Sequence, residues 1–231
     1  MITFENVNKT YDKTKHLALS DVNLNICKGD FVFVVGKSGA GKTTLIKMML
    51  KELDPSEGKI FVDGEDITGI KRRKIPFYRR KVGVVFQDYR LLSDKTVYEN
   101  VAYAMEIIEK KHKDIKEKVP EALKMVGLSH REKYYPDQLS GGEQQRVSIA
   151  RAIINDPKII ICDEPTGNLD PKTSVGIMKL LKDINDRGTT IIMATHDREI
   201  VNRMQSRVIT LHGGKVIGDK KGGYDCEDSY I

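Results

Sequence analysis

Apolar residues recur along the chain with two different patterns, and each pattern predicts a kind of element. Val22, Leu24 and Ile26 alternate with polar neighbours, which is typical of a half-buried strand. We therefore expect strands near residues 2–7 and 17–26, in an antiparallel edge region. Four continuous apolar runs instead predict strands that are buried on both faces, at residues 31–35, 82–86, 159–162 and 189–194.

Helical stripes of apolar residues lie between these runs, and they complete an α/β pattern with a mainly parallel sheet. The stripes run from Leu45 to Leu53, from Val97 to Ile108 and from Ile177 to Ile184. One helix has clear ends, because Asp170 can cap it, Pro171 suits its first position and Gly188 can terminate it.

The length of 231 residues favours a single functional domain spanning residues 1–231. Residues 88–140 are predicted to be mostly helical and to form a subdomain within it. Pro120 lies inside the helical segment 113–126, which leaves open whether that segment is one kinked helix or two. Residues 220–231 are rich in Gly, Asp and Lys and predict a loosely ordered tail.

The net charge of +6 is spread along the chain, so we interpret it as solvated surface and expect no nucleic-acid partner. The one local basic cluster consists of Lys71–Lys74 and residues 79–81, and it is a candidate contact site. The apolar runs are too short to span a bilayer, and the N-terminus does not resemble a secretory signal, which predicts a cytoplasmic location. The cysteines are odd in number and widely spaced, which predicts reduced thiols at Cys27, Cys162 and Cys226.

The strongest chemical signal is a glycine-rich loop that follows a buried strand and opens a helix. Its residues match the phosphate-binding P-loop pattern: Gly36, Lys37, Ser38, Gly39, Ala40, Gly41, Lys42 and Thr43. Glycines allow backbone N–H groups to converge on phosphate oxygens at a helix N-terminus. Lys42 is predicted to neutralise the β and γ phosphates of ATP, the Thr43 hydroxyl to bind Mg²⁺, and Thr44 to add a phosphate contact.

Polar residues follow three of the predicted buried strands. Asp163 and Glu164 end the strand at 159–162, where parallel sheets bind ligands in the crevice beyond their carboxyl ends. Hydrolysis of Mg·ATP needs a carboxylate near the metal and a base for the attacking water, so we assign Asp163 to Mg²⁺ and Glu164 to the water. Gln87 and His196 end two further strands and are expected at the same edge, with Gln87 as a metal ligand and His196 as a sensor of the γ-phosphate.

A second helix start has phosphate-binding features. Ser140 and Glu143 have the spacing of a capping box, which alone would explain them. A cap gains nothing from Gly141 and Gly142, whereas a phosphate that closely approaches a helix end needs bare backbone. We predict that this helix end contacts an ATP molecule held by another copy of the chain.

In this order, and over nearly the whole chain, these motifs resemble the nucleotide-binding domain of ABC ATPases. The motifs are Gly36–Thr43, Gln87, Leu139–Glu143, Ile159–Glu164, Gly167–Asp170 and His196. The resemblance implies an ATP-dependent, head-to-tail homodimer with Ser140 and Gly142 acting across the interface. It also implies that Asp170 lies in the dimer-contact loop and that Tyr11 stacks on adenine.

Within that family, the stretches around Tyr89 and Tyr98 look like those of the bacterial cell-division ATPases. This resemblance implies a polytopic membrane partner of the FtsX type, a peripheral position on the inner face of the cell membrane, and an indirect link to extracellular peptidoglycan hydrolases. Two alternatives stay open: the ATPase of a transporter for lipoprotein release or macrolide export, and a soluble ABC ATPase of cofactor assembly.

Overall fold

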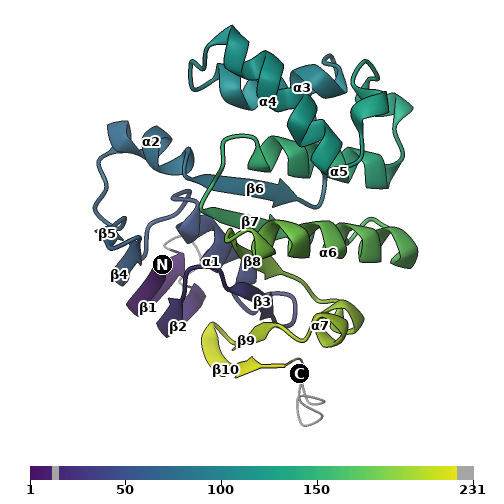
Figure 1. The fold of residues 1–231 in the computed structure, drawn as a ribbon. Coiled ribbons are helices and arrows are strands. Elements are labelled where there is room, and N and C mark those ends of the chain that lie inside the picture. The colour runs from purple at the N-terminus through teal and green to yellow at the C-terminus, as the bar shows by residue number, and fades with distance from the viewer. Residues whose placement is uncertain (12–15, 223–231) are drawn as a thin grey trace. The chain divides into compact units, whose positions relative to one another are not determined.

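The computed structural model describes residues 1–11 and 16–222, which divide into two compact units (Figure 1). Unit one contains Met1–Arg79 and the chain from Thr190 onward, and unit two contains Arg80–Thr189. Strands and helices occur in both units, as the apolar pattern predicts for an α/β protein.

An antiparallel sheet opens unit one, with the strand order β2-β1-β4-β5. Its strands are β1 (Ile2–Tyr11), β2 (His16–Ile26), β4 (Glu57–Val62) and β5 (Glu65–Asp66). The alternation that predicted β2 is confirmed, because Val22, Leu24 and Ile26 are buried and the polar residues between them are exposed. The predicted antiparallel edge region is therefore present.

A second group of strands in unit one pairs in the order β10-β9-β3-β8. Strand β3 (Phe31–Val35) is buried along its whole length and pairs in parallel with β8 (Thr190–Ala194) and with β9 (Arg207–His212). Strand β10 (Lys215–Lys221) lies antiparallel to β9. Helix α1 (Lys42–Met49) packs on β2 and β8, and the unit also contains η1 (Arg72–Lys74), α2 (Ile75–Arg79) and α7 (Arg198–Met204).

Unit two combines two parallel strands with four α-helices. Strand β6 (Val82–Phe86) pairs with β7 (Ile159–Asp163). The helices are α3 (Val97–Glu106), α4 (His112–Met125), α5 (Gly141–Ile153) and α6 (Pro171–Asp186), with short 3₁₀ turns η2 (Ser129–Arg131) and η3 (Pro136–Gln138). Helix α5 packs against β6, α3, α4 and α6, so it is the central helix of this unit.

The question raised by Pro120 is resolved, because α4 is one helix that continues through the proline. Pro120 is exposed, whereas Ile115, Val119 and Leu123 are buried. A proline removes one backbone hydrogen bond and crowds the preceding turn. Burial of the apolar stripe holds the helix together across that loss.

Four strands have no counterpart in the sequence prediction: β4, β5, β9 and β10. The predicted loose tail is wrong at its start, because Lys220 and Lys221 pair with Val208 and Arg207 in the β9–β10 ladder. The remainder of that prediction, residues 223–231, lies outside the described residues, as does Cys226. Among the described residues, no helix is long and apolar enough to cross a membrane.

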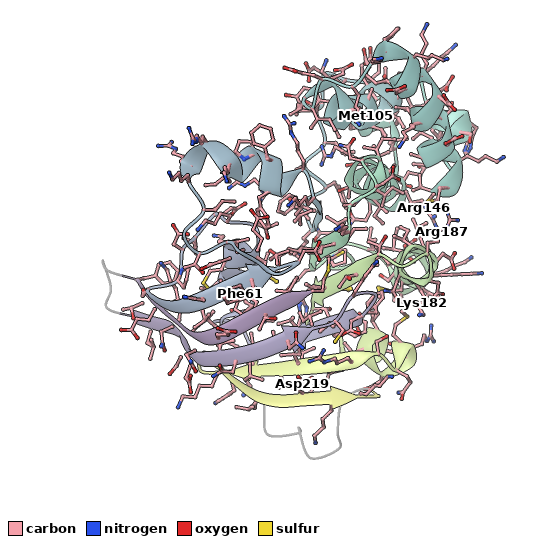
Figure 2. All side chains as sticks on the ribbon, turned by 60° about the vertical axis from the view of Figure 1, so that its left-hand side comes forward. Phe61, Met105, Arg146, Lys182, Arg187 and Asp219 are labelled. Carbon is pink, nitrogen blue, oxygen red and sulfur yellow. The ribbon has the colours of Figure 1, made fainter. Side chains whose placement is uncertain are left out.

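Arg207 joins three segments of unit one through its guanidinium. It donates to Asp219 at 2.8 and 2.7 Å, to Asp30 at 3.0 Å and to the Asn25 carbonyl at 2.8 Å. These carboxylates, Asp219 foremost, hold the pKa of Arg207 above its ordinary value. Asp219 lies on β10 (Figure 2).

We predict that Arg207→Gln lowers the free energy of unfolding by about 2 kcal/mol, because it removes several charge-assisted hydrogen bonds at once. The midpoint of urea unfolding checks this. Arg203→Gln is the control, since its partner Glu199 is 3.8 Å away and both side chains are mostly exposed, so it should cost less than about 0.5 kcal/mol. Equal effects of the two substitutions would contradict the bridging role of Arg207.

Candidate nucleotide-binding site

The predicted phosphate loop lies between β3 and α1, in the context that the pattern requires. Gly41 is the N-cap of α1 and has a left-handed backbone, with no side-chain cap on the helix. The hydrogen bond from Leu45 N–H to Gly41 O, 2.9 Å long, closes the first helical turn. The N–H groups ahead of Leu45 therefore have no intrahelical acceptor and are suited to bind an anion.

Close packing requires glycine at two positions of the loop, whereas the third glycine has open space around its Cβ position. A side chain at Gly36 would lie 2.3 Å from the Leu211 carbonyl oxygen, and one at Gly41 would lie 2.6 Å from Leu19. All three loop glycines have positive φ, but nothing lies within 4 Å of the Cβ position at Gly39. Residues Lys37–Gly39 are exposed, so the backbone of the loop is accessible to solvent here, and its binding of a phosphate group stays a prediction.

Lys42 reaches into the loop that precedes it. Its Nζ donates to the Gly36 carbonyl at 2.6 Å and to the Lys37 carbonyl at 3.1 Å. Thr43 is exposed and Thr44 is buried, where the Thr44 hydroxyl lies 3.2 Å from the Tyr11 hydroxyl. The loop cation and the predicted adenine-stacking tyrosine therefore belong to the same end of α1, within unit one.

His196 follows the strand that pairs with β3. Val34 and Ala194 are register partners in this parallel pair, so Gly36 and His196 are each two residues beyond a matched position. Thr195 N–H donates to the Val34 carbonyl at 3.2 Å, which extends the ladder past β8. The structure thus places the exposed His196 and the start of the phosphate loop at one edge of unit one.

Unit two holds a second group of predicted site residues at a strand edge of its own. Phe86 and Asp163 are register partners in the parallel pair β6–β7, so Gln87 and Glu164 are the next residue of each strand. Glu164 has φ of 49°, a left-handed backbone that is unusual for a residue with a side chain. Such conformations persist where the surroundings fix them, and they concentrate at functional sites.

Gln87 is tied to the turn that follows Glu164. Its amide nitrogen donates to the Asn168 side-chain oxygen at 3.2 Å, and the Asn168 amide donates to the Gln87 carbonyl at 3.1 Å. A Cβ at Gly167 would lie 2.9 Å from the Gln87 amide nitrogen. The stretch Gly167–Asn168 therefore needs its glycine for close packing, and it positions Gln87 through two reciprocal hydrogen bonds.

The capping box at the start of α5 is present. Glu143 N–H donates to Ser140 Oγ at 3.3 Å, and Ser140 N–H and Oγ donate to the Glu143 carboxylate at 2.9 and 2.8 Å. These bonds from Ser140, reinforced by Arg131 at 3.1 Å, hold the pKa of Glu143 below its ordinary value. Ser140 is exposed at the helix end, where the predicted contact to a second ATP molecule would lie.

Packing within unit two gives the paired glycines a role that the sequence argument denied. A Cβ at Gly142 would lie 2.4 Å from the Thr173 methyl group, and one at Gly141 would lie 2.9 Å from the Tyr89 hydroxyl. Close packing alone therefore explains glycine at both positions, so the paired glycines do not by themselves indicate a phosphate contact. The phosphate contact itself stays a prediction.

Asp170 caps α6 as predicted. Its carboxylate accepts from Thr173 N–H at 3.0 Å, and Pro171 occupies the first helical turn. Hydrogen bonds from the Thr173 side chain and then from its backbone lower the pKa of Asp170. The helix ends as expected, with Gly188 at φ of 100° just beyond it. Asp170 itself is exposed, at the end of the loop that precedes α6.

Sequence reasoning missed Gln145, which connects three parts of unit two. Gln145 is fully buried on α5, and its amide nitrogen donates to the Pro165 carbonyl at 2.7 Å and to the Phe86 carbonyl at 3.4 Å. Its side-chain oxygen has no hydrogen-bond partner among the described residues. One amide thus joins α5 to the backbone just before Gln87 and just after Glu164. The sequence offers no signal for this, since Gln144 and Gln145 are adjacent and alike.

Arg151 is a second such residue. It donates to the Tyr89 and Arg90 carbonyls at 2.8 and 2.6 Å, and burial lowers its pKa. Tyr89 and Arg90 both have left-handed backbones, with φ of 58° and 49°. The guanidinium of Arg151 therefore holds the strained segment that follows Gln87.

Comparison with protein families gives one decisive match: residues 19–167 match the family model described as "ABC transporter". The chain belongs to the ABC transporter family. As a member of this family it is an ATPase, which binds ATP and hydrolyses it. The predicted fold class and activity are thereby confirmed.

Individual relatives within the family cover almost the whole chain. The cell division ATP-binding protein FtsE of Bacillus subtilis is 52% identical over 96% of this chain and 97% of its own length. The FtsE protein of Escherichia coli is 47% identical over 94% and 98% of the two chains. A solved ATP-binding cassette, a dimer in a post-hydrolysis state with ADP and Pi, is 37% identical over 96% and 98%, with a TM-score of 0.85.

We predict that Lys42→Ala abolishes ATP binding in isothermal titration calorimetry, because it removes the main counter-charge of the phosphates. Lys47→Ala is the matched control, since Lys47 is an exposed lysine on the same helix, and it should leave ATP affinity unchanged. Unchanged affinity of the Lys42 variant would refute the assigned role.

We also predict that Gln145→Leu lowers the steady-state rate of ATP hydrolysis at least about tenfold, because the buried Pro165 carbonyl loses its donor and the turn after Glu164 shifts. ATP affinity should stay within about twofold, since phosphate binding is assigned to α1. The control is Gln144→Leu, whose amide donates to the Leu139 carbonyl. A folded Gln145 variant with full activity would contradict the positioning role.

Proposed function

We propose that the chain is the ATP-hydrolysing subunit of a membrane complex that acts in bacterial cell division. The observation that carries this proposal is the set of relatives named FtsE, which are 47% to 52% identical and align with 94% to 99% of the chain. The aligned regions include the predicted site residues at the strand edges of unit one and unit two, together with the helices that position them.

In unit one, the assigned ATP contacts are Tyr11, the loop Gly36–Thr43 and Thr44. The geometry supports these roles, because the helix end offers uncapped N–H groups and Lys42 lies inside the loop. His196 stands at the same edge and is assigned to the γ-phosphate. ATP supplies the phosphoryl group that is transferred to water, and the chain supplies charge and position.

Mg²⁺ is the proposed metal. Thr43, Gln87 and Asp163 offer hydroxyl, amide and carboxylate oxygens, which are the donors that Mg²⁺ prefers. The described residues contain no group of three or more His, Cys, Asp or Glu side chains suited to a metal ion. A Mg²⁺ ion bound with ATP takes much of its coordination from phosphate and water rather than from a protein cage. Glu164 is assigned as the base for the attacking water.

We further propose that two copies of the chain bind two ATP molecules between them, head to tail. The exposed Ser140 and Asp170 caps and the bare backbone at Gly141 and Gly142 support this arrangement. Dimeric structures of related cassettes also support it. In this arrangement the start of α5 completes the site of the partner copy.

The proposed partner is a polytopic membrane protein of the FtsX type, on the inner face of the cell membrane. Through it, the ATP cycle would relay a signal to peptidoglycan hydrolases outside the cell. The transporter and cofactor-assembly alternatives differ from this in their partner, so the identity of the partner separates them.

We predict that Glu164→Gln binds ATP normally but hydrolyses it at least about a hundredfold more slowly, as expected for loss of a general base. With ATP it should accumulate as a dimer, measured by light scattering with the membrane partner present. Glu121→Gln, an exposed acid on α4, is the control and should hydrolyse ATP at the normal rate.

Mass spectrometry of proteins that co-purify with the tagged Glu164 variant from solubilised membranes tests the division role. A polytopic protein with a large extracellular loop, together with wall hydrolases, is the expected result. A many-spanning permease with a solute-binding protein would make the chain a transporter ATPase. A partner from the cytosol alone would favour cofactor assembly.

A further inference from the structure

Four consecutive cations, Lys71–Lys74, precede α2 in unit one, and all four side chains are exposed. Within residues 1–11 and 16–222, none of them forms an ion pair or a side-chain hydrogen bond. Residues Arg72–Lys74 form the 3₁₀ turn η1, in which successive side chains point about 120° apart. The four charges therefore spread around the turn, and we call them the basic segment.

An exposed aromatic ring follows the basic segment by three residues. Phe77 is 60% exposed, whereas the next residue, Tyr78, is 3% exposed. The Tyr78 hydroxyl donates to the Met49 carbonyl, and the Arg79 guanidinium donates to the Leu50 and Lys51 carbonyls at 3.1 Å each. Successive residues of a helix point about 100° apart, so this anchor directs Phe77 outward. Side chains around α2 extend away from the strands of the unit (Figure 2).

The same contacts join the basic segment to the phosphate loop through one helix. Tyr78 and Arg79 bind the carbonyls at the C-terminal end of α1, and the phosphate loop occupies its N-terminal end. Helix α1 has eight residues and is therefore about 12 Å long. A displacement of α2 would therefore be transmitted along the short helix α1 to the residues that are assigned to ATP binding.

We propose that the basic segment and Phe77 form a docking surface for an anionic phospholipid membrane. Clustered Lys and Arg side chains are attracted to the negative surface of such a membrane, and an adjacent phenyl ring can insert at the headgroup level. A site for single-stranded nucleic acid instead uses several aromatic rings along a cationic groove, and this surface presents one. The inference rests on the proposed function, because a peripheral subunit of a membrane complex works next to the lipid surface.

Sedimentation of the full chain with lipid vesicles tests this surface. The chain should bind vesicles of phosphatidylcholine with one third phosphatidylglycerol, and should not bind phosphatidylcholine alone. Binding should weaken as salt is raised, since salt screens attraction between exposed charges. Duplex and single-stranded DNA, titrated under the same conditions, should bind more weakly than the anionic vesicles.

Two variants and a control define the surface. The segment variant should lose on the order of several hundredfold in vesicle partitioning, because each of its four cations near the surface contributes about fivefold. Phe77→Ser should lose about tenfold without any change in charge. The dispersed control removes four exposed lysines of unit two and should lose less than about threefold. The segment variant is K71Q/R72Q/R73Q/K74Q, and the dispersed control is K113Q/K116Q/K133Q/K179Q.

Three results would overturn the proposal: no binding to the anionic vesicles, equal loss in the segment variant and the dispersed control, or tighter binding to DNA. Co-purification of the polytopic partner is measured on the same variants, after circular dichroism has shown that they are folded. Failure of vesicle binding with an intact partner overturns the surface alone. Intact vesicle binding with no membrane partner overturns the proposed function alone.

Discussion

Parallel strand pairing is the constraint on which the predicted chemistry of this chain depends. Each residue assigned to catalysis follows the last residues of a buried strand, so its position is set by the register of that strand with its neighbour. Val34 opposite Ala194 aligns the phosphate loop with His196, and Phe86 opposite Asp163 aligns Gln87 with Glu164. A slip of one residue in either pair would turn these side chains to the other face of the sheet. Strands β3 and β8 are buried along their whole lengths, so a slip there would force close-packed apolar side chains to repack.

The sequence was sufficient for the strands β3, β6, β7 and β8, for the phosphate loop and for the caps of α5 and α6. Each depends on a local pattern that physics restricts to few meanings: a continuous apolar run, glycines at fixed spacing, or Asp followed by Pro. Strands β4 and β10 escaped prediction because each contains poor strand formers: Glu, Gly and Lys in Glu57–Val62, and Gly, Asp and Lys in Lys215–Lys221. They form because β1 and β9 offer an edge with which to pair.

Tertiary contacts explain what remained hidden at the site. Nothing local distinguishes the buried Gln145 from its neighbour Gln144, and only the arrival of Phe86 and Pro165 from other elements gives its amide acceptors. The left-handed conformation of Glu164 is equally invisible, because it is imposed by the turn that Gln87 and Asn168 close. Gln145 and Asn168 show that the strand ends are held by side chains which themselves take no part in the predicted chemistry. Packing and hydrogen bonding, more than the spacing of the motifs, determine how each side chain at the strand ends is oriented.

The close approach of Gly142 to Thr173 changes how genetic data on this helix start should be interpreted. Any side chain at position 142 collides first with the opening turn of α6 inside the same chain. Loss of function in a Gly142 mutant would therefore be ambiguous, since a local steric defect and a lost contact with nucleotide across a dimer give the same phenotype. A second-site change that shortens Thr173 relieves the first defect and leaves the second. Suppression by such a change would assign the loss of function to the steric defect within the chain.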